Sequence, residues 1–190
     1  NNRIRGFDWG PWLMNLSDTT WSRILVNAGK SIIATGADGL FIDVAVTSPL
    51  MLSPDATPSP RAIAAYPADM KAILAAIKSG VTPAAVIFNG LNQAALPYAD
   101  VTDGGMTEGF VAQPWKVGLA NCTDWWGFMM DAELTAQATR NSTILNVGLG
   151  ADAPVSVRMY ALASHLLVAN SHTFYYYYAN TGLAYYPEMD

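Results

Sequence analysis

Long amphipathic stretches alternate with short apolar runs along the chain, and this pattern predicts helices and strands in alternation. We expect helices over about 19–35, 60–79, 124–139 and 155–169. We expect strands at 39–45, 84–89, 143–148 and 173–178, with another strand and its mouth within 100–110. Helices and strands in this order are typical of right-handed βαβ units, which build a parallel sheet.

The expected strands are near-continuous apolar runs, which is typical of parallel strands that are covered on both faces. Five or six strands are visible, whereas a whole (β/α)8 barrel takes about 250 residues. We therefore predict an α/β fold in which residues 1–190 form the C-terminal part of a (β/α)8 TIM-type barrel, as one partial domain of a longer chain. The competing fold is an open doubly wound sheet, which a chain of this length could complete alone.

Composition narrows the function classes. Hydrophobic residues make up 52% of the chain and charged residues 13%, with a formal net charge of −5. No basic cluster occurs, so we expect no nucleic-acid partner. No apolar run reaches the roughly 18 residues that a membrane span needs. Metal-ligand spacings, glycine-rich nucleotide loops and a Gly-x-Ser-x-Gly elbow are absent from the sequence, so we expect no metal and no cofactor.

Polar residues lie near the carboxyl ends of four successive expected strands, as Asp43, Asn89, Glu108 and Asn146. In a barrel these ends converge on one mouth, where catalysis takes place. Each residue also has a structural explanation: Asp43 could cap the next loop, and Asn89-Gly90 is a turn dipeptide. Glu108 stands between glycines and apolar residues, which is an unusual setting for a solvated carboxylate.

Aromatic residues point towards a carbohydrate ligand, because sugar rings stack on aromatic rings while carboxylates and amides bind the hydroxyls. Trp12, Trp115 and the end of the tyrosine run at 175–178 are the candidates to line the mouth. Asp103 is a further candidate for binding hydroxyls, although Asp103-Gly104 is also typical of a turn.

Three sequons, at Asn15, Asn121 and Asn141, are glycosylation candidates. Three are slightly more than chance predicts, and they favour a secreted, extracellular glycoprotein.

The ordered series WLMNL at 12–16, GADGLFID at 36–43, FNG at 88–90 and DGGMTEGF at 103–110 resembles the hypothetical glycosyl hydrolases with a (β/α)8 barrel. The resemblance implies that Asp43 lies on about the fourth barrel strand and Glu108 on about the sixth. It implies Asp43 as the nucleophile and Glu108 as the acid/base, with Asn89 and Asp103 positioning sugar hydroxyls. Asn146 is a further substrate-binding candidate. The sequence leaves open whether such a pair retains or inverts the anomeric configuration.

The alternative function belongs to another class: a non-catalytic extracellular glycoprotein that keeps the barrel as a carbohydrate-binding or assembly subunit. Few charges and many aromatic residues suit a subunit packed against other chains or against a preceding part of the barrel. The two functions differ in whether Asp43 and Glu108 face one open pocket.

Overall fold

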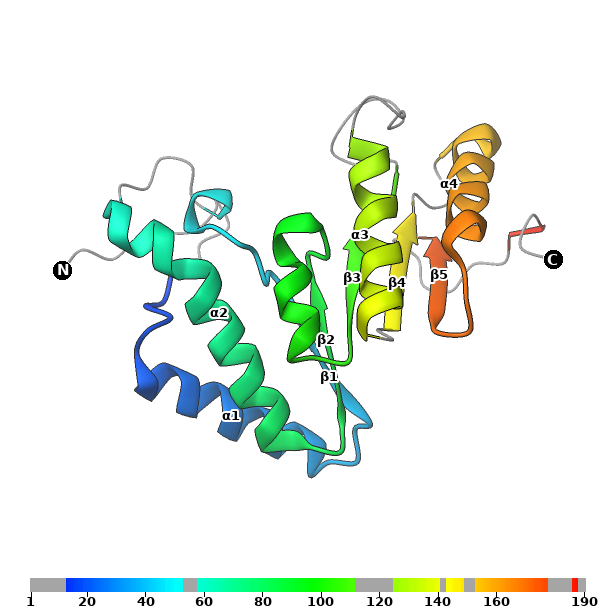
Figure 1. The fold of residues 1–190 in the computed structure, drawn as a ribbon. Helices are drawn as coiled ribbons and strands as arrows, with labels where there is room; N and C mark the ends of the chain where they lie inside the picture. Colours follow the sequence, from blue (N-terminus) through cyan, green and yellow to red (C-terminus); the bar gives the residue numbers. More distant parts are fainter. Residues whose placement is uncertain are drawn as a thin grey trace.

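The computed structural model describes residues 13–52, 58–111, 125–140, 143–148, 153–177 and 186–187 (Figure 1). Its helices are α1 (Thr19–Ile33), η1 (Pro49–Met51), α2 (Pro60–Val81), η2 (Gln93–Asp100), α3 (Trp125–Arg140) and α4 (Val155–Val168). Its strands are β1 (Gly39–Ile42), β2 (Ala85–Asn89), β3 (Gly104–Glu108), β4 (Thr143–Gly148) and β5 (Thr173–Tyr177). The predicted alternation of helices and strands is therefore confirmed.

The five strands form one parallel sheet in the order β1-β2-β3-β4-β5. Each strand pairs with the next strand along the chain, which is the arrangement of a barrel wall. A doubly wound sheet would reverse its strand order midway. The observed order therefore excludes the competing fold for the described part of the chain.

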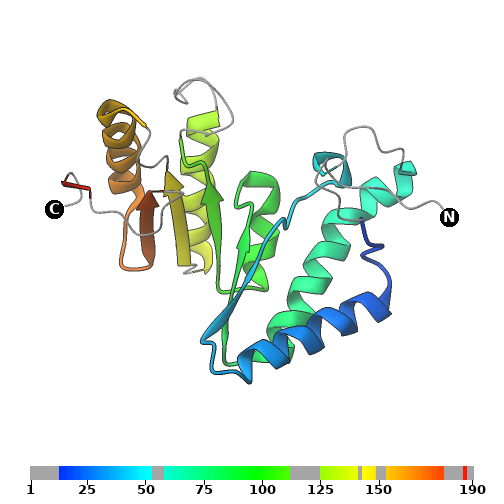
Figure 2. The same ribbon diagram turned by 180° about the vertical axis from the view of Figure 1, so that it is seen from behind.

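The two faces of the sheet differ in what covers them. Figures 1 and 2 show the described helices on one face, with the strands open to view from the other side. Side chains alternate between the faces, so Val86 and Phe88 are fully buried under the helices. On the opposite face, Phe41 is 50% exposed and Phe174 is 56% exposed. In a barrel this face points towards the barrel axis.

The core lies between the sheet and the helices. One cluster joins α1, α2 and the first two strands through Leu40, Ile73, Ile77 and Val86. A second joins η2 to the middle of the sheet, where the rings of Phe88 and Tyr98 meet edge to face. These clusters hold the carboxyl ends of the strands in register.

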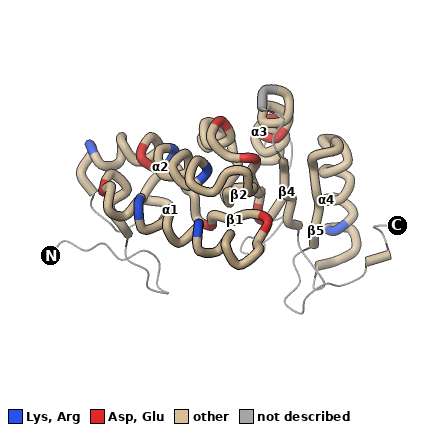
Figure 3. The backbone as a smooth tube through the Cα atoms, turned by 90° about the horizontal axis from the view of Figure 1, so that it is seen from below, with Lys and Arg blue, Asp and Glu red and all other residues tan. Residues whose placement is uncertain are grey.

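Local signals explain where the first helices begin. The side chain of Asp18 accepts a hydrogen bond from the backbone N–H of Thr20 at 2.8 Å, as expected of an N-cap. The hydroxyl of Ser59 caps α2 in the same way, and Pro60 occupies its first turn. Basic and acidic residues are interspersed along α1 and α2 (Figure 3).

Candidate active site

Three polar side chains meet at the carboxyl ends of neighbouring strands. Asp43 directly follows β1, Asn89 ends β2 and Glu108 ends β3. The side-chain nitrogen of Asn89, Nδ2, donates to Oδ1 of Asp43 at 2.9 Å. It also donates to Oε2 of Glu108 at 2.9 Å. One amide group therefore bridges the two carboxyl groups, and we call these residues the Asp43–Asn89–Glu108 group.

This bridge limits the distance between the two carboxyl groups. Both oxygens lie 2.9 Å from the same nitrogen, so they can be no more than twice that distance, 5.8 Å, apart. In glycosidases the two carboxyl groups lie about 5–5.5 Å apart in retaining enzymes and about 6.5–9.5 Å apart in inverting enzymes. The geometry is thus close to the retaining class.

Strand alternation explains why the three side chains share one face. Asn89 is paired in register with Met106, two residues before Glu108. Asp43 comes two residues after Phe41, which points to the open face. Because residues two apart on a strand point the same way, the group lies on the face opposite the helices. Asp43 and Glu108 are both exposed and Asn89 is half-buried.

The backbone is strained beside both carboxylates. Val44, next to Asp43, has φ 58°, and Val111, three residues after Glu108, has φ 50°. A β-branched residue rarely adopts such a conformation, and strain of this kind gathers at functional sites. At Val44 it has a visible use, because the N–H of Val44 donates to Oδ1 of Asp43 at 2.8 Å.

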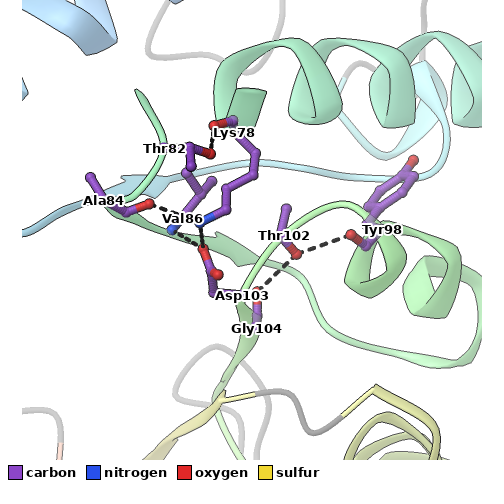
Figure 4. A network of polar contacts seen from close by, with 8 residues as sticks. All are labelled: Lys78, Thr82, Ala84, Val86, Tyr98, Thr102, Asp103 and Gly104. Atoms are coloured by element: carbon purple, nitrogen blue, oxygen red, sulfur yellow. Dashed lines mark hydrogen bonds and ion pairs between the residues drawn. The ribbon is translucent and has the colours of Figure 1, made fainter. Parts of the chain in front are cut away.

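Asp103 does not join this group. It directly precedes β3, at the opposite end of the strand from Glu108. Its carboxylate pairs with Nζ of Lys78 at 2.7 Å and accepts the N–H of Val86 at 2.7 Å (Figure 4). The expected contact with sugar at the mouth is therefore wrong for Asp103, which ties α2 to the start of β2 and β3.

Asn146 also lies away from the mouth. Its side chain is buried on the helix side of β4, and its Nδ2 donates to Oε2 of Glu133 on α3 at 2.9 Å. The register explains the error: Val147 pairs with Glu108 and Asn146 pairs with Thr107, so Asn146 points the opposite way from Glu108. The substrate-binding assignment of Asn146 is corrected accordingly.

The aromatic candidates divide into two sets. Trp12, Trp115 and Tyr178 lie outside the described residues. The rings of Tyr175 and Tyr177 meet edge to face, and Tyr175 also contacts His165 of α4, so both tyrosines belong to the helix side. The sequence analysis missed the exposed rings of Phe41 and Phe174 on the open face.

The sequon at Asn15 lies in an exposed turn, where Oδ1 of Asn15 accepts the hydroxyl of Ser17 at 2.9 Å. Asn121 and Asn141 fall outside the described residues. In the part of the chain that the structure describes, no helix is long and apolar enough to cross a membrane. Nor do three or more His, Cys, Asp or Glu side chains come together there in a way that could hold a metal ion.

Glu133 is a buried carboxyl group that the sequence analysis did not single out. It is 0% exposed, and burial raises its pKa to about 7, against the opposing effect of hydrogen bonds from Asn146 and Thr107. A pattern could have found it, because Met130 and Ala136, three residues on either side, are buried on the same stripe of α3.

Comparisons with known proteins agree with this architecture. The chain matches the sequence profile of hypothetical glycosyl hydrolase family 15 over residues 1–190, and it belongs to that family. A comparison with curated protein sequences found no match. The expected resemblance to hypothetical glycosyl hydrolases is thus confirmed.

Solved structures with a similar fold include the glycoside hydrolase domain of PelA from Pseudomonas aeruginosa, with a TM-score of 0.64 at 16% sequence identity. A single-substitution variant of that domain matches with a TM-score of 0.61, also at 16% identity. Each match covers 92% of this chain and 66% of the other, so the chain spans less than two thirds of the length of these structures. The fold is that of a TIM-type barrel, as predicted, with a parallel five-stranded sheet alternating with helices.

Proposed function

We propose that this protein is a glycoside hydrolase that cleaves its substrate with Asp43 and Glu108. The observation that carries the proposal is the bridge from Asn89 to both carboxyl groups. Glycosidic cleavage uses two carboxyl groups on either side of the scissile bond, and this pair has the required separation. Its location agrees with the proposal, since active sites of such barrels lie at the carboxyl ends of the strands.

Asp43 is suited to be the nucleophile. Its Oδ1 accepts two hydrogen bonds, from Val44 N–H and from Asn89 Nδ2, which orient the carboxylate. Its other oxygen, Oδ2, is left to attack the anomeric carbon. As the new carbon–oxygen bond forms, the glycosidic bond breaks and its electron pair goes to the leaving oxygen.

Glu108 is suited to be the acid/base. Its Oε2 accepts from Asn89, and the side chain is exposed, so a proton can be exchanged at the carboxyl group. In the first step Glu108 gives a proton to the leaving oxygen. In the second step it takes a proton from a water molecule, which attacks the anomeric carbon and releases Asp43.

Asn89 then has a different role from the one expected. In the structure its Nδ2 already donates to both carboxyl groups, so this nitrogen orients the pair instead of binding a sugar hydroxyl. Its side-chain oxygen is the atom that could accept a hydrogen bond from the substrate.

The substrate we propose is an extracellular poly- or oligosaccharide. The three sequons support an extracellular location, and Asn15 lies in an exposed turn where a glycan has room. Mass spectrometry of the native protein tests this location, because unmodified Asn15, Asn121 and Asn141 would remove its support.

The test of the enzyme is hydrolysis of a panel of soluble polysaccharides, measured as new reducing ends. Asp43→Asn and Glu108→Gln should each lower the rate by about 10²–10⁴-fold, the usual contribution of such a group. Asp131→Asn removes an exposed carboxylate from α3 and should leave the rate unchanged. Equal rates for all four proteins would refute the carboxylate mechanism.

A further inference from the structure

Behind Glu108, on the other face of the sheet, lies a buried polar cluster formed by Thr107, Glu133, Asn146 and His165. Glu133 accepts from the hydroxyl of Thr107 at 3.4 Å and from Nδ2 of Asn146 at 2.9 Å. The same Asn146 nitrogen lies 3.2 Å from Nδ1 of His165. The cluster therefore connects α3 and α4 to β3 and β4.

The position of the cluster relates it to the proposed active site. Thr107 immediately precedes Glu108, and strand alternation sends one side chain to each face of the sheet. Thr107 and Glu108 pair with Asn146 and Val147 of β4. Any shift of Glu133 that moves Thr107 must therefore also move the end of β3 that carries Glu108.

The cluster is costly to the fold, which suggests a use beyond packing. Glu133 lies on a helix stripe between Met130 and Ala136, where an apolar residue would pack without penalty. No Lys or Arg contacts Glu133 among the described residues. Strongly perturbed titratable groups of this kind are more frequent at functional sites than elsewhere.

The groups that face Glu133 do not compensate a negative charge. From β3 and β4 it meets the neutral side chains of Thr107 and Asn146. Beyond Asn146 lies His165 of α4, whose pKa is lowered by burial, with the ring of Tyr175 from β5 stacked on it. The helix η2 also packs on α3, and its charged residue, Asp100, pairs with Lys71.

We infer that Glu133 is a positioning residue for Glu108, acting through Thr107, and that ionisation of Glu133 loosens this positioning. The inference rests on the proposed function of Glu108. While Glu133 is neutral, the cluster closes under the end of β3 and holds it. Once Glu133 is ionised, an uncompensated charge is buried there, and the structure around it must open to water to relieve the cost.

This mechanism predicts a pH response in the neutral range, since burial raises the pKa of Glu133 to about 7. Below that pH the end of β3 is held and hydrolysis is fast. Above it, misplacement of Glu108 should lower kcat by roughly 10- to 100-fold, the scale of loss when a catalytic group shifts by about an ångström. Glu133→Gln, which has the same shape and stays neutral, should keep the high rate above pH 7.

Nuclear magnetic resonance tests the positioning without any activity measurement. The 190 residues contain only three glutamates, Glu108, Glu133 and Glu188, so 13C labelling of glutamate carboxyl groups gives few signals to assign. In the native protein the Glu108 signal should show a second inflection where Glu133 titrates. In Glu133→Gln that inflection should be lost.

Thr107→Val separates mechanical positioning from a direct charge effect. It removes the hydroxyl that joins β3 to Glu133 but leaves Glu133 buried and ionisable. If Thr107 transmits the effect, the second inflection of Glu108 is lost in this variant too, while Glu133 still titrates. An inflection that persists in Thr107→Val, or that is absent from the native protein, would overturn the inference. Loss of all hydrolysis with the inflections as expected would instead refute the proposed function alone.

Discussion

Oδ1 of Asp43 and Oε2 of Glu108 lie within 5.8 Å of each other, because one nitrogen of Asn89 donates to both. Two carboxylates on neighbouring strands repel each other when both are charged. An amide group between them offers each a hydrogen bond without adding charge, so it can hold them at a fixed spacing. The Asp43–Asn89–Glu108 group is therefore built around its central amide.

Replacing Asn89 tests that dependence. Asn89→Leu keeps the approximate size but removes both hydrogen bonds, so we expect kcat to fall by about tenfold or more as the pair loses its alignment. Asn89→Asp places a third carboxylate beside two others, so one of the three must take up a proton. Its activity should shift to lower pH relative to the native protein. Native kinetics for Asn89→Leu would show that the amide does not align the pair.

Asp103 allows a test of structure against substrate binding. Asp103→Ala removes the ion pair with Lys78 and the acceptor for Val86 N–H, so the free energy of unfolding should fall by about 1–2 kcal/mol. Lys78→Met removes the same ion pair from the other side. Denaturant titrations should show a loss in both variants, with KM unchanged. A raised KM in Asp103→Ala alone would return this residue to the substrate site.

Most of the fold could be predicted from the sequence, because helix spacing, caps and apolar runs are local signals. Asp18 and Ser59 begin α1 and α2 as such signals indicate. The short helices η1 and η2 were not predicted, since both are 3-10 segments without the spacing of an α-helix.

The site was harder to predict, because it depends on where each strand starts and on its register. Asp43, Asn89 and Glu108 were grouped correctly since each stands at the end of an apolar run. Asn146 was misplaced by one residue, and a shift of one reverses the face on which a side chain lies. Asp103 was misplaced because 100–110 was treated as one strand with its mouth, whereas β3 begins after Asp103.

The buried carboxyl group of Glu133 should make stability depend on pH. Its pKa is raised from 4.5 to about 7 in the folded chain, so the fold binds the proton more tightly than the unfolded chain does. The stabilising effect of the neutral form is complete below pH 4.5 and is lost as pH rises through 7. The loss should be about 3 kcal/mol. Denaturant titrations at several pH values should show this fall in native protein, and a flatter profile in Glu133→Gln.

Gly104 should be required for the close approach of β3 and β4. A Cβ atom added there would collide with the backbone carbonyl of Thr143, which cannot move without separating the strands. We expect Gly104→Ala to lower the free energy of unfolding by about 1–3 kcal/mol, as overpacking does. Gly105→Ala is the matched control, because its Cβ would meet side-chain atoms of Leu91 and Phe88 at 3.0 Å, which can shift. An equal loss in both variants would contradict this explanation.

The spacing of Asp43 and Glu108 finally predicts the stereochemistry of the reaction. An inverting enzyme needs a water molecule between its base and the sugar, and its carboxyl groups lie about 6.5–9.5 Å apart to make room for it. The oxygens bridged by Asn89 are no more than 5.8 Å apart, which leaves the nucleophile in contact with the anomeric carbon itself. Hydrolysis should therefore proceed with retention.

Proton NMR of the first product, recorded before mutarotation, checks this by comparing the anomeric signal with that of the substrate. Because the covalent intermediate forms on Asp43, Asp43→Gly with added azide should restore turnover and give a glycosyl azide of inverted configuration. Glu108→Gly with azide should give the retained azide, since Asp43 still attacks first. A hydrolysis product of inverted configuration from the native enzyme would exclude the double displacement, even if both carboxylates proved essential.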